Sequence, residues 1–68
     1  MYSESLQNQT REYFKKMPMA MMKQFGTDTF GYGKLEPEGG YSIYLFKSDE
    51  VVTFKSMNEL LKAGWAID

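Results

Sequence analysis

The chain has 68 residues and a formal net charge of −1 at pH 7, and it contains neither cysteine nor histidine. Its length suits a single domain over residues 1–68, and the missing residue types exclude disulfides, thiol chemistry and the usual zinc ligands. So small a net charge produces no general attraction to nucleic acid or to an anionic membrane.

The first predicted element is a helix that begins at Ser3 or Ser5, since either serine can cap its N-terminus. Apolar side chains then recur at helical intervals, at Leu6, Tyr13, Phe14, Met17, Met21 and Phe25. Pro18 lacks the N–H that would continue the helix, so the helix either kinks there or ends and a second helix begins at Pro18. Because the apolar pattern stays in phase through Pro18, we expect two closely coupled helical pieces that end at Gly26.

The middle of the chain predicts a three-stranded antiparallel sheet. The first strand is Thr27–Leu35, in which Gly31 and Gly33 indicate a bulge or a close backbone approach. The second strand is Tyr41–Lys47 and the third is Val51–Phe54, joined to the second as a hairpin. Polar and glycine-rich turns separate the strands.

The C-terminal region predicts a short helix. Ser56 and Glu59 have the spacing of a capping box, and Gly64 is typical of the residue that ends a helix. We expect Trp65 to pack the remaining tail back onto the domain. The predicted fold class is therefore α+β, with an N-terminal helix kinked or broken at Pro18, three antiparallel strands and a short C-terminal helix.

The residue types argue against an enzyme. Without histidine or cysteine the common general base and the thiol nucleophile are missing, and most carboxylates fall in predicted turns, where water surrounds them. We expect no metal and no cofactor. The first twenty residues lack the apolar run of a signal peptide, and no stretch is long and apolar enough to span a membrane. We therefore expect a cytoplasmic protein without a membrane partner.

The leading functional hypothesis is a small non-enzymatic protein-binding regulator, adaptor or inhibitor. Met19 and Met22 fall away from the centre of the helical stripe, and exposed methionines suit adaptable protein-binding surfaces. Strand alternation places Tyr44 and Phe46 together on one face of the sheet. Met19, Met22, Tyr44 and Phe46 are therefore the candidate protein-binding residues. A chain of this size is also typical of an accessory protein of a phage or mobile element.

Two other functions stay open. An uncovered sheet face with aromatic and lysine side chains would bind single-stranded nucleic acid by stacking on bases. The candidates for that role are Tyr32, Lys34, Tyr44, Phe46, Lys47 and Lys55. The third hypothesis is a structural homo-oligomer such as a homodimer, in which a second copy covers apolar surface that so short a chain cannot bury by itself.

Overall fold

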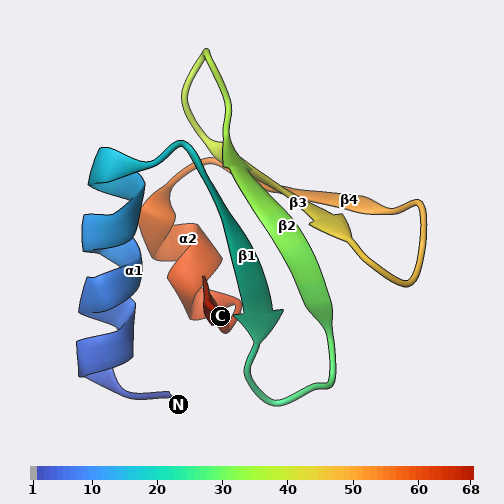
Figure 1. Cartoon of the computed structure of the whole chain (residues 1–68), viewed down its shortest axis with the longest axis horizontal. Helices are drawn as coiled ribbons and strands as arrows, with labels where there is room; N and C mark the ends of the chain where they lie inside the picture. Colours follow the sequence, from blue (N-terminus) through green and yellow to red (C-terminus); the bar gives the residue numbers. More distant parts are fainter. Residues whose placement is uncertain (1) are drawn as a thin grey trace.

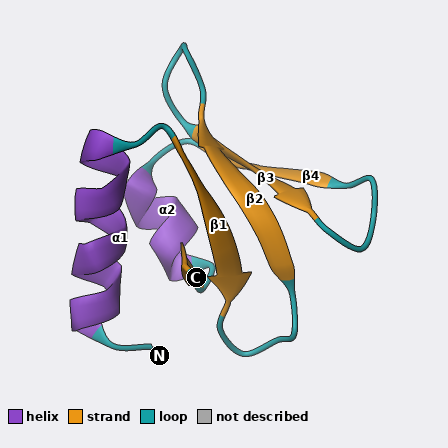
Figure 2. Cartoon of the chain, in the orientation of Figure 1, coloured by secondary structure: helices purple, strands orange, loops and turns teal. Residues whose placement is uncertain are grey.

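In a computed structural model that describes residues 2–68, the chain forms one antiparallel sheet with both helices packed on the same face (Figure 1, Figure 2). Met1, the first residue of the predicted domain, lies outside the described residues. The elements in chain order are α1 (Glu4–Lys16), β1 (Met19–Gln24), β2 (Phe30–Leu35), β3 (Tyr41–Leu45), β4 (Val51–Phe54), α2 (Met57–Lys62) and β5 (Trp65–Ile67). The strand order in the sheet is β4-β3-β2-β1-β5, and every neighbouring pair is antiparallel.

The α+β class is confirmed, but the sheet has five strands rather than the predicted three. One added strand is β1, where a second helical piece was expected. The residue before a proline avoids helical backbone angles, and Met17 is extended, with φ −125° and ψ 134°. The helix therefore ends at Lys16. The interval of four from Met17 to Met21 suits a helix, but because four is even it also keeps both residues on one face of a strand.

The second added strand is β5, formed by the predicted tail. Trp65 does pack back onto the domain and is only 2% exposed. The tail also pairs with β1, and the Asp68 N–H donates to the Met21 carbonyl oxygen at 2.9 Å. A three-residue strand is too short to show an alternation of its own, so local pattern could not predict it.

The core lies between the sheet and the helices. Its buried apolar residues come from both helices and from strands β1, β3 and β5: Phe14, Ala20, Met22, Ile43, Leu60, Leu61 and Trp65. Strand β2 contributes two glycines to this face. A Cβ atom at Gly33 would lie 2.7 Å from Met22 Cγ, and one at Gly31 would lie 2.6 Å from Ile43 Cγ2. A close backbone approach is present at Gly31, where the added Cβ would also lie 2.9 Å from the Tyr44 carbonyl oxygen, whereas side chains pack against Gly33. The continuous register of β2 with both neighbours shows no bulge.

The helix boundaries follow the capping residues. Ser3 Oγ accepts a hydrogen bond from the Leu6 N–H at 3.2 Å, and Ser56 Oγ accepts one from the Glu59 N–H at 3.2 Å. Gly64 follows α2 with φ +93°, a left-handed angle that favours glycine. The predicted start of the first helix and both ends of the last one are therefore confirmed.

Candidate interaction surface

The face of the sheet away from the helices carries large apolar side chains. Strand alternation and register place these residues on it, and we call them the aromatic face: Met19, Met21, Phe30, Tyr32, Tyr44, Phe46 and Val51. Phe46 lies one residue beyond β3 and continues the alternation, because its N–H donates to the Phe30 carbonyl oxygen at 3.1 Å. All but Tyr32 are exposed, from 40% for Met19 and Tyr44 to 53% for Phe46.

These side chains form rows across the strands. Met21, Tyr32, Tyr44 and Val51 are directly opposite one another on successive strands β1 to β4. Phe30 and Phe46 lie beside that row. Directly opposite residues have Cβ atoms about 4.5–5.5 Å apart, so neighbouring members of the row stand beside one another. The row of apolar residues therefore crosses the sheet from β1 to its β4 edge.

Lysines border the aromatic face. Lys34 pairs with Met19 and Ser42 in the register, so it extends from the same face and is half-buried. Lys23 lies opposite Phe30, and its Nζ is 3.7 Å from Asp68 Oδ1. The Tyr32 hydroxyl donates to Met19 Sδ on the neighbouring strand. The surface is thus apolar at its centre and carries few charges at its border.

The structure brings most of the predicted site residues together. Met19, Tyr32, Tyr44 and Phe46 belong to the aromatic face, and Lys34 borders it.

Met22 does not belong to this face, because it is 0% exposed and lies in the core; the prediction that it is exposed was wrong. The helical reading assigned Met21 to the core and Met22 to the surface. In a strand, with Met19 facing out, Met21 faces out as well and Met22 faces in.

Lys47 and Lys55 lie at opposite ends of the sheet. Lys47 follows Phe46 in the turn between β3 and β4, and Lys55 follows the last residue of β4. Only Lys34 and Lys23 therefore extend from strands of the aromatic face. The sequence prediction missed Phe30, although strand alternation places it on the same face as Tyr32.

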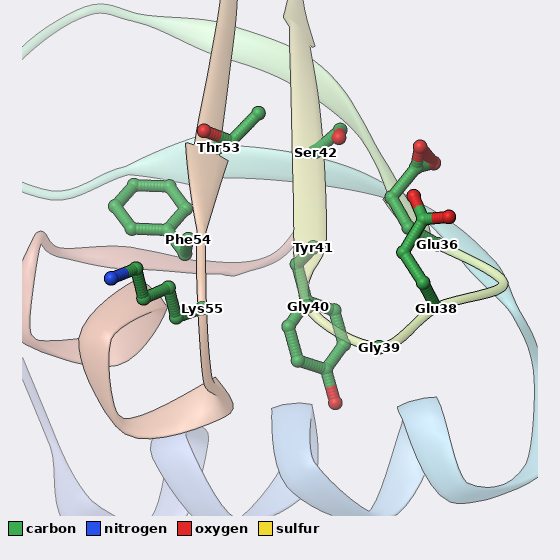
Figure 3. A pocket seen from close by; sticks show the side chains of 9 residues that line it. All are labelled: Glu36, Glu38, Gly39, Gly40, Tyr41, Ser42, Thr53, Phe54 and Lys55. Atoms are coloured by element: carbon green, nitrogen blue, oxygen red, sulfur yellow. The ribbon is translucent and has the colours of Figure 1, made fainter.

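The end of the sheet near Lys55 contains an open hollow of about 440 Å³. Figure 3 shows the Glu36 and Glu38 carboxylates beside the turn that joins β2 to β3, with Lys55 farther away beyond β4. Hydroxyl side chains of Ser42 and Thr53 also line the hollow, and no hydrogen bond joins either of them to a carboxylate in residues 2–68. Within residues 2–68 there is no group of histidine, cysteine or carboxylate side chains that could hold a metal ion, and no helix long and apolar enough to cross a membrane.

The β5 edge of the sheet is covered by the N-terminal segment. Tyr2 Oη lies 2.8 Å from the Trp65 carbonyl oxygen and 3.0 Å from the Leu61 carbonyl oxygen. Thr10 Oγ1 accepts a hydrogen bond from the Ile67 N–H at 3.2 Å. Burial raises the pKa of the Tyr2 phenol above its ordinary value of 10.0, and the nearby Arg11 charge opposes this shift. These contacts use two of the backbone groups that β5 directs outward, the Trp65 carbonyl oxygen and the Ile67 N–H.

Comparison of the chain with protein-family models, with curated proteins and with solved structures finds no match. Function is therefore inferred from the residues themselves.

Proposed function

We propose that this chain is a non-enzymatic protein-binding module that uses the aromatic face to bind a larger protein, as a regulator, adaptor or inhibitor. The observation that supports it most is the placement of large apolar side chains. The helices cover one face of the sheet, while Met21, Phe30 and Phe46 stay more than 40% exposed on the other. Contiguous exposed apolar surface of this kind marks interaction sites on soluble proteins.

The composition of the aromatic face suits a protein partner. Aromatic and methionine side chains are enriched in the centres of protein interfaces, and charged residues are depleted there. Tyr44 and Tyr32 are adjacent, and each offers a ring with a hydroxyl at its tip. Met19 and Met21 add flexible side chains that adjust to an irregular surface. A cytoplasmic location and an accessory role in a phage or mobile element are parts of this proposal.

Affinity capture from a lysate of the source organism tests the proposal with three baits. The wild-type chain is compared with the double variant Tyr44→Ser/Phe46→Ser and with Tyr13→Ser, which removes an exposed aromatic ring from α1. We expect a small set of proteins that the wild type and Tyr13→Ser enrich equally and that the double variant loses at least tenfold. Equal enrichment by all three folded baits would contradict the use of the aromatic face.

One observation favours single-stranded nucleic acid as a second candidate ligand. Phe30, Tyr32, Tyr44 and Phe46 present four rings on adjacent strands of one face, with Lys34 on the same face. Stacking of one base on one ring is worth about 1–3 kcal/mol. Fluorescence anisotropy with labelled oligonucleotides would show binding that weakens steeply with salt. No change in anisotropy at low salt excludes this candidate.

A further inference from the structure

The two edges of the sheet differ in how their backbone groups are used. At the β5 edge, Tyr2 binds the outward-facing carbonyl oxygen of Trp65 and Thr10 binds the outward-facing N–H of Ile67. Among residues 2–68, no side chain makes a hydrogen bond of this kind to the β4 edge. The Leu45 N–H donates to the Glu50 carbonyl oxygen at 3.1 Å, so these two residues form a hydrogen-bonded pair between β3 and β4. In an antiparallel ladder such pairs alternate with pairs that are not hydrogen-bonded to each other. Val51 and Thr53 therefore direct their N–H and carbonyl groups away from β3.

Natural edge strands are protected by being very short, by charged residues or proline, by a bulge or by a covering segment. With four residues β4 is short, but its sequence carries none of the other protective features. Strand β4 reads Val-Val-Thr-Phe, without a charge or a proline, and its register with β3 is regular. Three of its four residues are β-branched and favour extended backbone. The strand is thus built to pair on both sides and is paired on one.

We propose that β4 pairs antiparallel with β4 of a second copy of this chain, with Val52 opposite Val52 of the second copy. In this register Val51 lies opposite Thr53 of the second copy, and Thr53 opposite Val51. These are the residues whose backbone groups face outward, so the two copies exchange N–H···O=C bonds on both sides of the twofold axis. Directly opposite residues also keep the same face, as an antiparallel sheet requires.

Charge supports both the occupant and the register. Asp49 and Glu50 precede β4, and Lys55 follows it. Antiparallel pairing of two copies places the acidic end of one strand against the basic end of the other, with Asp49 opposite Lys55 at both ends. Moving the register by two residues would instead place Val51 opposite Lys55, so the attraction would be lost.

The dimer has a consequence for the aromatic face. Because the twofold axis is perpendicular to the sheet, both aromatic faces lie on one side and both pairs of helices on the other. The two five-stranded sheets join into one continuous sheet, in which the row that ends at Val51 in one copy continues into Thr53 and Ser42 of the second copy. This inference does not depend on which ligand the aromatic face binds.

Sedimentation equilibrium over a range of concentrations tests the dimer. We expect the mass to rise from 7.9 kDa toward twice that value with concentration. Thr53→Pro removes an outward N–H and leaves the bonds to β3 intact, so the variant should stay monomeric, whereas Thr53→Val should dimerise like the wild type. A wild type that is monomeric at every concentration overturns the proposal. So does a dimer that Thr53→Pro, folded by circular dichroism, does not weaken.

Charge reversal tests the register without changing β4 itself. Asp49→Lys and Lys55→Glu each place like charges opposite one another in a homodimer, and we expect each to weaken self-association roughly tenfold. Mixing the two variants restores attraction at both ends, so a heterodimer should form about as tightly as the wild-type dimer. Failure of the mixture to associate better than either variant alone overturns the register.

The double variant Tyr44→Ser/Phe46→Ser separates this dimer from one in which two aromatic faces pack against each other. The β4 dimer should persist in the double variant. If the double variant is monomeric and Thr53→Pro still dimerises, the second copy covers the face rather than the edge, and the proposal is wrong.

Discussion

The two faces of the sheet are built from the same kinds of residue but use them differently. Toward the helices, Met22 and Ile43 are completely enclosed, and β2 offers glycines where side chains would collide. Away from the helices, Met21 and Tyr44 stand in the next positions along the same strands and are at least 40% exposed. The comparison shows that residue type alone does not decide burial here, because adjacent methionines have opposite environments.

Replacing each of the two adjacent methionines tests this contrast most strongly. Met22→Ala leaves a cavity in the core and should lower the free energy of unfolding by about 2–5 kcal/mol. Met21→Ala removes a side chain that water already reaches and should change it by less than about 0.5 kcal/mol. Urea unfolding followed by circular dichroism measures both. Similar losses in the two variants would mean that β1 does not alternate as described.

Adding a side chain at Gly31 of β2 has the next largest expected effect on stability. In Gly31→Val the Cβ would lie 2.6 Å from Ile43 Cγ2 and 2.9 Å from the Tyr44 carbonyl oxygen, so backbone must shift. We expect a loss of about 1–3 kcal/mol, which corresponds to a fall in Tm of roughly 4–8 °C per kcal/mol for a domain of this size. Lys34→Val, on the opposite face of the same strand, is the control and should leave Tm nearly unchanged.

At the β5 edge of the sheet, the Tyr2 hydroxyl binds the carbonyl oxygens of Leu61 and Trp65. Tyr2→Phe should cost about 1 kcal/mol at neutral pH because it removes a hydroxyl that binds buried carbonyl groups. The raised pKa of Tyr2 means that the folded state favours the neutral phenol. Its contribution is therefore complete below about pH 10 and is lost as the pH rises through the raised folded-state pKa.

Comparing the two proteins across that pH range isolates the contribution of Tyr2. The difference in unfolding free energy between wild type and Tyr2→Phe should shrink above about pH 10. A difference that stays constant up to strongly alkaline pH would show that the Tyr2 hydroxyl is not part of the fold.

The smallest expected effect on stability comes from the aromatic face itself. Phe46 is 53% exposed, so Phe46→Ser should change the free energy of unfolding by less than about 0.5 kcal/mol. A loss as large as that of a core residue would show that the exposed rings stabilise one another and are not a free surface.

The sequence predicted the elements whose signals are local. The caps at Ser3 and Ser56 and the glycine at Gly64 marked helix ends, and alternation placed Tyr44 and Phe46 on one face. The signal failed at β1, since an interval of four residues fits both a helix and a strand, and Pro18 was given too little weight. The predicted helix therefore assigned Met21 to the core and Met22 to the surface, whereas Met21 is exposed and Met22 is buried.

Part of the surface could not be predicted from local pattern. Strand β5 depends on a neighbour from the other end of the chain, so its three residues carry no pattern of their own. Alternation separates the faces of a sheet but does not tell which face the helices will cover. That depends on the glycines of β2, which give Phe14 and Met22 room on one side only.

The contacts of Tyr2 also bear on the order in which the chain folds. Strands β1 to β4 each pair with the next along the chain across short turns, so these pairings close small loops. The Tyr2 hydroxyl instead bonds to residues 59 and 63 positions away. Because such distant contacts form after local ones, we expect the strand meander to belong to the folding nucleus and the two chain ends to dock last. Weakening Tyr2 would then speed unfolding while leaving the folding rate almost unchanged.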